Sequence, residues 1–198
     1  MEGLIGMEIT ELDLPDVHLI ELEPHVDHRG HFMRVYDDET FEAHGLHGEW
    51  VQENHSYSKA AGTVRGMHFQ FPPDAETKLV RVVRGKIFDT FVDLRRDSST
   101  FGEWDGVVLS AENRRMLYVP RGFAHGFCTL TDDCDVTYKV DSYYAPENEG
   151  GIRWDDPELG IDWPVDEPIL SEKDGKADSF EAFVEAHSGL EPEYKRRT

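Results

Sequence analysis

The sequence predicts one all-β domain, an antiparallel β-sandwich or jelly roll, with a few short helices, mainly C-terminal. Three observations support this fold class: short β-branched and aromatic runs, frequent Gly, Pro and Asp between them, and very little helical periodicity. The 198 residues are enough for one hydrophobic core. We therefore expect a single domain over residues 1–198, with its core over about 17–174 and a C-terminal helix and tail over 175–198.

The alternation is clearest in two segments. Ile87–Leu94 alternates well, and in Cys134–Val140 the residues Val136 and Tyr138 alternate with polar neighbours, as in a half-buried strand. The Thr131-Asp132-Asp133 segment before the second run predicts a hairpin turn. Further strands are expected at 17–22, 62–71, 78–84, 106–109 and 116–119.

Two short helices are expected, over 39–44 and 179–187. The second would place Phe180, Phe183 and Val184 on one side. Residues 191–198 are expected to form a loose tail.

The charge excludes several classes of protein. The chain has 41 Asp and Glu against 20 Lys and Arg, a formal net charge of −21, so nucleic-acid binding is not expected. Hydrophobic residues make up 38% and are spread throughout, which argues against disorder. We expect a salt-rich (halophilic) cytoplasm, where salt screens the self-repulsion. An ordinary acidic enzyme is the alternative.

The chain shows no sign of membrane insertion or export. It has no run of about 18 apolar residues, and its first ten residues do not resemble a secretory signal. Cys128 and Cys134 are too few for a disulfide framework and lack metal-ligand spacing. A cytoplasmic protein without membrane partners is expected.

One strand carries a candidate general base. In an extended 63–70 segment, Val64 and His68 would share one face with Gln70, and Arg65 would lie on the other face. An imidazole facing a cavity can act as a base near neutral pH. A hydrogen-bonded core histidine is the alternative interpretation of His68.

Two further side chains are expected to point inward. Tyr138 lies on the apolar face of its strand, so its phenol needs a partner or a function, although a simple core tyrosine is the common case. Lys78 shares strand parity with Val80 and Val82, and a buried ammonium requires a counter-charge or an anionic ligand. Lys78 could therefore hold an enolate oxygen or a phosphate.

In the segment 119–127, Pro and Gly bracket a turn, and His125 follows it at the start of the next strand. Together with His68 it suggests a metal site, but Gln70 and Lys78 stand where further ligands would be needed. No metal is expected, because a cation beside Lys78 is disfavoured.

Taken together, these segments resemble the dTDP-4-dehydrorhamnose 3,5-epimerase family, which has a cupin-type jelly-roll fold. The resemblance covers about Val17 to Asp174, in the family's order. The matching segments are 28–30, 51–56, 65–70, 78–80, 92–95, 110–113, 120–127, 138–139, 143–144, 152–157 and 170–174.

The resemblance implies a role for each matched residue. His68 would be the base, Asp174 the carboxylate that orients it, Tyr138 the acid on the opposite face of the sugar, and Lys78 the group that stabilises the enolate. By itself the segment around Asp174 is typical of a surface turn. Substrate binding would fall to Arg29, Gln52, Asn54, Arg65, His125, Tyr144 and Glu149.

The implied reaction is epimerisation at C3 and C5 of a dTDP-linked 4-keto-6-deoxyhexose, giving dTDP-4-dehydrorhamnose. The C4 ketone acidifies the neighbouring C–H groups and serves as the electron sink, so no cofactor is expected. The resemblance also implies a homodimer, which would solve an unpaired-edge problem of the sheet.

The chain departs from the family at Arg34, which stands where the family has a glutamate that reaches the nucleotide of a neighbouring subunit. The base of the nucleotide is therefore left open. The alternatives are a single 3-epimerase, a 3,4-ketoisomerase, a non-catalytic sugar-nucleotide-binding cupin and a metal-dependent cupin oxygenase.

Overall fold

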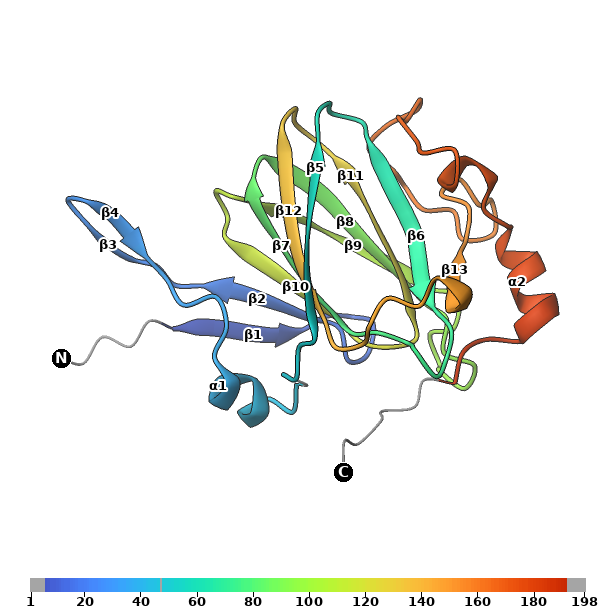
Figure 1. Cartoon of the computed structure of the whole chain (residues 1–198), viewed down its shortest axis with the longest axis horizontal. Helices are drawn as coiled ribbons and strands as arrows, with labels where there is room; N and C mark the ends of the chain where they lie inside the picture. The colour runs from blue at the N-terminus through green and yellow to red at the C-terminus, as the bar shows by residue number, and fades with distance from the viewer. Residues whose placement is uncertain (1–5, 47, 192–198) are drawn as a thin grey trace.

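The computed structural model describes residues 6–46 and 48–191. Two antiparallel sheets face each other, and the predicted all-β fold is confirmed (Figure 1). The first sheet has the order β1-β2-β10-β7-β12-β5, with β1 (Met7–Glu11), β2 (His18–Leu22), β10 (Arg115–Val119), β7 (Lys78–Arg84), β12 (Cys134–Val140) and β5 (Gln52–Ser58). The second has the order β13-β6-β11-β8-β9, with β13 (Glu149–Gly151), β6 (Val64–Gln70), β11 (Phe123–Thr129), β8 (Lys86–Asp93) and β9 (Trp104–Ser110).

The chain passes back and forth between the sheets, as in a jelly roll. From β10 onward, each strand lies in the sheet opposite its predecessor. The predicted hairpin at residues 131–133 is therefore wrong: β11 pairs with β6 and β8, whereas β12 pairs with β5 and β7. The turn residues reverse the chain, but they do not determine which sheet the next strand joins.

The main core lies between the two sheets. Val80, Leu117 and Val136 from the first sheet meet Phe91 and Phe127 from the second. All five are 5% exposed or less. This apolar layer fixes the two walls between which the polar site described below is formed.

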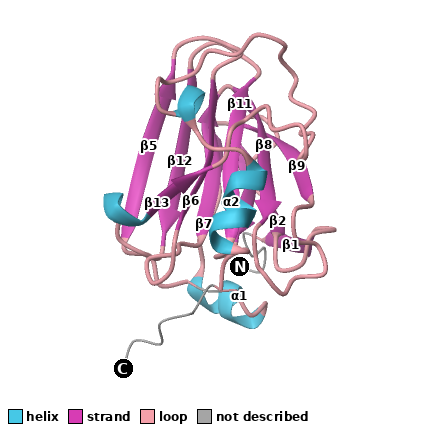
Figure 2. Cartoon of the chain, turned by 90° about the vertical axis from the view of Figure 1, so that its right-hand side faces the viewer, coloured by secondary structure: helices cyan, strands magenta, loops and turns pink. Residues whose placement is uncertain are grey.

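Helix α2 (Phe180–His187) covers the outer face of the second sheet (Figure 2). Ser179 caps it by accepting a hydrogen bond from the amide of Ala182, and Phe180 and Phe183 are buried in the cluster on that face. The predicted helix over 179–187 is confirmed. Of the predicted tail 191–198, only Glu191 lies within the described residues.

Helix α1 (Asp38–Ala43) matches the predicted helix 39–44 to within one residue. Asp37 caps it, and Phe41 is fully buried in a cluster with residues of the first sheet. In the described part of the chain, neither α1 nor α2 is long and apolar enough to cross a membrane.

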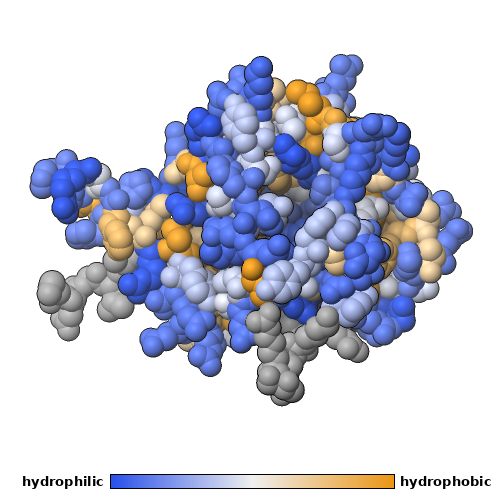
Figure 3. All heavy atoms as spheres, viewed as in Figure 1, coloured by the Kyte–Doolittle hydropathy of each residue, from blue (hydrophilic) through white to orange (hydrophobic). Residues whose placement is uncertain are grey.

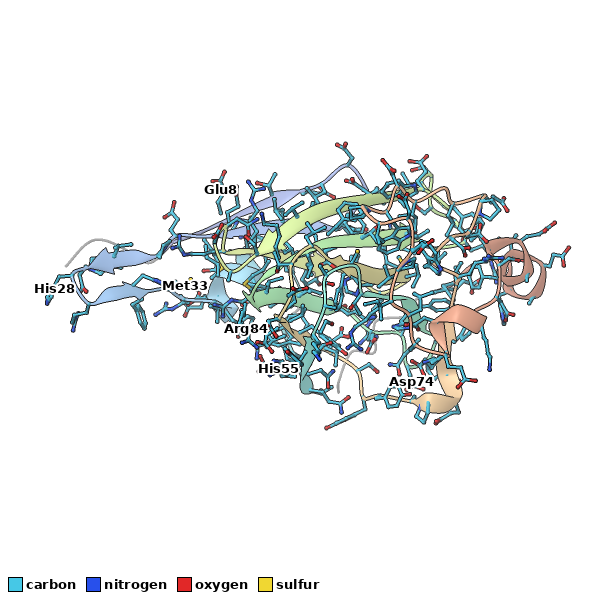
Figure 4. The ribbon with its side chains drawn as sticks, turned by 90° about the horizontal axis from the view of Figure 1, so that it is seen from above. Glu8, His28, Met33, His55, Asp74 and Arg84 are labelled. Carbon is cyan, nitrogen blue, oxygen red and sulfur yellow. The ribbon has the colours of Figure 1, made fainter. Side chains whose placement is uncertain are left out.

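Strands β3 (His25–Asp27) and β4 (Gly30–Phe32) form a separate hairpin. It projects from the body of the molecule, and Figure 4 shows His28 at its tip. Val26 and Phe32 on it are 66% and 63% exposed. In the register Val26 is opposite His31 and Phe32 is opposite His25, so the two exposed side chains lie on the two faces of the hairpin.

Candidate functional site

An irregularity in β6 shapes the site. Arg65 pairs with Phe127 and His68 with His125, so β6 has one more residue than β11 between these two pairs. Gly66 lies in this bulge with φ +135°, and a Cβ there would be 2.5 Å from the Cα of Gly126. Only glycine fits such a backbone in such close contact with its neighbour.

The bulge changes which side chains share a face. Arg65 and His68 both line the space between the sheets, while Val64 and Met67 pack outward with α2. The prediction that Val64 shares the face of His68, with Arg65 opposite, is therefore wrong. The extra residue shifts the two-residue period of the strand by one position.

His68 is held by a buried carboxylate. Its Nε2 lies 2.6 Å from Oδ1 of Asp174, and the two side chains are 33% and 6% exposed. Burial alone would raise the pKa of Asp174, but the hydrogen bond and the attraction of His68 outweigh it and hold this pKa below its ordinary value. The ionised carboxylate accepts the Nε2 hydrogen, which leaves Nδ1 as the nitrogen with a lone pair.

The segment that carries Asp174 lies at the surface, but Asp174 itself is turned inward. The segment forms a short 3-10 helix, η2 (Asp174–Lys176), and the Asp174 amide donates to Oγ of Ser171 at 3.0 Å. Asp174 itself is 5% exposed. The surface-turn interpretation therefore holds for the exposed residues 171–173 and 175–176, but it is wrong for the Asp174 side chain, which is buried against His68 of β6.

Lys78 faces inward as predicted, with its side chain 9% exposed. Its Nζ lies 3.3 Å from the carbonyl oxygen of His68 and 3.3 Å from a carboxylate oxygen of Glu76. The ammonium is therefore placed directly beside the histidine backbone, with a counter-charge that makes its burial tolerable.

Tyr138 lies on β12, opposite Val80 of β7 and Asn54 of β5, and packs against the main core. Burial raises the pKa of Tyr138, the charges of Glu76 and Glu149 add to this, and Arg65 opposes it. The phenol therefore remains protonated at neutral pH and can act as a proton donor.

Two adjoining cavities meet at His68, Lys78 and Tyr138. The first, of about 320 Å³, is called here the amide lobe, since Gln52, Asn54 and Gln70 line it. The second, of about 220 Å³, is called the cationic lobe. Its lining includes Arg65, His125 and Lys173. Three of the four predicted catalytic residues thus lie at the junction, and Asp174 lines the cationic lobe.

The amide lobe also holds two of the predicted binding residues. The Tyr144 amide donates to Oε1 of Gln52 at 2.8 Å, and the Tyr144 hydroxyl donates to Glu149 at 2.8 Å. The Tyr144 side chain is held at the mouth, since this residue is 58% exposed. An exposed aromatic ring in such a position can stack on a flat ligand.

His125 is fixed by a residue that sequence reasoning missed. Its Nε2 lies 2.7 Å from Oδ1 of Asp89, whose side chain is fully buried. Asp89 lies between Ile87 and Phe91, which face the main core, and a carboxylate between two such apolar positions is the signal that could have revealed it. Glu76, two residues before Lys78, and Lys173, next to Asp174, were also missed.

Arg29 is the one predicted binding residue that lies outside both cavities. It is on the projecting hairpin, its side chain is 79% exposed, and it pairs with Asp27 of the same hairpin. Within one chain the structure does not bring Arg29 to the site.

No group of three or more His, Cys, Asp or Glu that could hold a metal ion occurs among residues 6–46 and 48–191. His68 and His125 are neighbours across β6 and β11, but each is paired with its own aspartate. The absence of a metal from the function stays a prediction.

Comparison with known proteins decides the family. The family model described as dTDP-4-dehydrorhamnose 3,5-epimerase matches residues 11–182. The chain belongs to this family. The resemblance inferred from the sequence is confirmed, and so is its classification as an isomerase.

Relatives of this epimerase family are close in sequence and structure. The dTDP-4-dehydrorhamnose 3,5-epimerase of Methanothermobacter thermautotrophicus is 52% identical over 159 residues, which are 79% of this chain and 85% of the relative. A crystal structure of the Bacillus anthracis epimerase with TDP and PPi bound is 48% identical, with a TM-score of 0.87 over 88% of this chain and 100% of that chain. The predicted cupin-type jelly roll is confirmed by such matches.

One of the similar solved structures is of a protein with a narrower activity. ChmJ of Streptomyces bikiniensis, a 3'-monoepimerase solved with dTDP-quinovose, is 35% identical, with a TM-score of 0.84 over 91% of each chain. The fold is therefore shared by enzymes that invert one carbon and enzymes that invert two.

Proposed function

We propose that this epimerase inverts C3 and C5 of a dTDP-linked 4-keto-6-deoxyhexose through an enolate. The observation that carries the proposal is the His68–Asp174 pair, at 2.6 Å, lining a cavity that Tyr138 enters from the other sheet. A base on one wall and an acid on the other suit removal of a proton from one face of a sugar and its return to the opposite face.

The steps follow from the placement of three side chains. His68 removes the proton from the carbon beside the ketone, and Asp174 stabilises the imidazolium that forms. The charge moves onto the C4 oxygen, where the Lys78 ammonium holds it. Tyr138 then gives its proton to the other face of the same carbon.

The cationic lobe suits the diphosphate. Arg65 presents a guanidinium fork that matches phosphate oxygens, with His125 and Lys173 in the same lining. On a chain of net charge −21, a local cluster of positive charge is what an anionic ligand requires. The nucleoside would lie beyond the diphosphate, which links it to the sugar. Tyr144, exposed at the mouth of the cavities, would stack on its base, with Gln52, Asn54 and Glu149 as further contacts of the nucleotide.

The test is proton NMR of dTDP-4-keto-6-deoxyglucose with the enzyme in deuterated, high-salt buffer. Deuterium at both C3 and C5, with the rhamno product, would support the proposal. If neither carbon exchanges with the dTDP-linked sugar, the measurement is repeated with the UDP-linked sugar. No exchange with either substrate would refute the proposal.

A single 3-epimerase is the second candidate, because the 3'-monoepimerase ChmJ shares the fold at 35% identity. It predicts deuterium at C3 alone. A 3,4-ketoisomerase would move the carbonyl, and a non-catalytic binding protein would bind the sugar nucleotide without exchange. Stoichiometric iron or zinc in the purified protein would favour a metal-dependent cupin oxygenase.

We also propose that the enzyme acts as a homodimer in which Arg29 reaches the site of a neighbouring subunit. The projecting hairpin supports this, because it exposes Val26 and Phe32 and carries Arg29 away from its own cavities. The guanidinium would meet the diphosphate, beside Arg65.

Subunit mixing tests this arrangement. Arg29→Ala and His68→Ala are each expected to be impaired, whereas a dimer with one subunit of each kind has one site with both residues intact. Activity should therefore recover on mixing, at a mass twice the 22.7 kDa of one chain. A monomer, or no recovery in confirmed mixed dimers, would contradict the shared site.

We further propose that the enzyme works in a salt-rich, reducing cytoplasm. Hydrophilic side chains cover most of the face shown in Figure 3, and Cys128 and Cys134 are buried free thiols. The range of electrostatic repulsion falls from about 10 Å at 0.1 M salt to about 3 Å at 1 M, so salt should stabilise a chain of charge −21.

The expected result is a melting temperature that rises between about 0.1 and 1 M KCl, with structure lost on dialysis to low salt. Circular dichroism during thermal unfolding measures it, with sucrose at matched osmolality as the control. Full stability in low salt would contradict the proposal.

A further inference from the structure

A carboxylate that the proposed mechanism does not use lies inside the amide lobe. Glu76 precedes β7, and its Oε1 is 3.3 Å from the Lys78 ammonium. The two side chains are only 14% and 9% exposed. This is a sheltered ion pair facing the sugar position, not a surface pair that water weakens.

The other contact of Glu76 is weaker. Its Oε2 lies 3.4 Å from Nε2 of Gln70, but that amide donates to the carbonyls of Asp74 and Tyr143 at 2.8 and 3.2 Å. An amide nitrogen has two hydrogens, and the nearer carbonyls take both. Lys78 is therefore the group that Glu76 principally holds.

Lys78 in turn has two anchors in the described structure. They are Glu76 and the carbonyl oxygen of His68, each at 3.3 Å. An ammonium has three hydrogens, so this arrangement leaves one for a ligand in the cavity. With the backbone anchor alone, a flexible four-carbon side chain would sample several positions.

We propose that Glu76 is a positioning residue for the epimerisation: its carboxylate fixes the Lys78 ammonium beside His68 and so determines where the enolate oxygen is held. The inference rests on the proposed function of Lys78. A small misplacement of such a group is costly, because its contribution depends on being preorganised where the charge develops.

The same charge gives the inference a separate signature. Burial is the main cause of the raised pKa of Tyr138, and the negative charge of Glu76 is the next. Glu149 also raises this pKa and Arg65 lowers it. The charged or titratable groups that share the two lobes with the phenol are Arg65 and His68 on β6, Glu76 and Lys78 at β7, His125 on β11, Tyr144, Glu149 on β13, and Lys173 and Asp174 at η2.

Two variants separate position from charge. Glu76→Gln keeps the shape and loses the charge, so kcat should fall about tenfold with KM changed less than about twofold. The alkaline limb of the kcat profile should also move to lower pH, because the pKa of Tyr138 falls. Glu76→Asp keeps the charge but is too short to hold Lys78, so kcat should fall while the alkaline limb stays.

Glu21→Gln is the matched control, since Glu21 pairs with Arg115 at 2.8 Å on β2 and β10, outside both lobes. It should behave as the wild type. Wild-type kcat and an unchanged pH profile in Glu76→Gln would overturn the inference. A higher kcat would also overturn it, because it would mean that the charge of Glu76 only reduces the stabilisation of the enolate by Lys78. Failure of the wild type to exchange C3 and C5 would instead refute the proposed function.

Discussion

His68→Ala is expected to lower kcat by about 10²- to 10⁴-fold, the range that a positioned general base contributes. Without the imidazole, no described group at the junction of the lobes is both hydrogen-bonded to a buried carboxylate and free to accept a proton. Deuterium exchange at C3 and C5 should fall with turnover, because both depend on the same proton removal. NMR in deuterated buffer measures exchange and inversion together.

The fold should be kept in this variant, because the His68 side chain is 33% exposed and lies in a cavity wall, not in the packed core. Its free energy of unfolding should fall somewhat, since Asp174 loses the partner that offsets its burial. Thermal unfolding and binding of dTDP are the controls. Asp174→Asn gives a graded comparison: the amide oxygen can still accept the Nε2 hydrogen, but the charge that stabilises the imidazolium is lost. Exchange near the wild-type rate in His68→Ala would remove His68 as the base.

Much of this enzyme could be predicted from its sequence, because many segments obey simple periods. The alternation in β12 predicted that Tyr138 points to the interior, and it does. In β7, Lys78 was predicted to point inward because it shares a face with Val80 and Val82, and it is buried. The apolar side of α2 located that helix to within one residue. In each case burial on one face is what the local pattern records.

The missed parts have physical reasons. Strand β5 was not predicted because its cavity-facing residues are polar, with Gln52 and Asn54 lining the amide lobe, so no apolar face is left to detect. A functional cavity removes the very signal by which strands are found. The bulge at Gly66 likewise reversed the side predicted for Arg65, since a strict two-residue period has no place for an extra residue.

The pairing of distant segments was out of reach of any local pattern. Asp174 meets His68 across 106 residues, and Asp89 meets His125 across 36. The first was expected only from the family resemblance, and the second was not expected. Side-chain chemistry suggests that a buried histidine has a partner, but only the fold decides which carboxylate it is.

Tyr138→Phe is expected to separate two events that the wild type performs together. Proton removal by His68 needs no phenol, so deuterium should still enter the substrate, returned by His68 to the face from which the proton was taken. Inversion requires a donor on the opposite wall, and its rate should fall by about 10²- to 10⁴-fold. The product of the variant is thus expected to be deuterated substrate with its original configuration.

The pH profile gives this prediction a second readout. A tyrosine donates only while protonated, and burial raises the pKa of Tyr138, so the wild type should keep its activity beyond pH 10 and lose it as the phenol ionises. In Tyr138→Phe the residual exchange should lack this alkaline loss up to the pH at which the protein unfolds. Tyr57→Phe, on the exposed face of β5, is the matched control and should leave both rates unchanged. Inversion at the wild-type rate in Tyr138→Phe would mean that another group on the first sheet, or water, returns the proton.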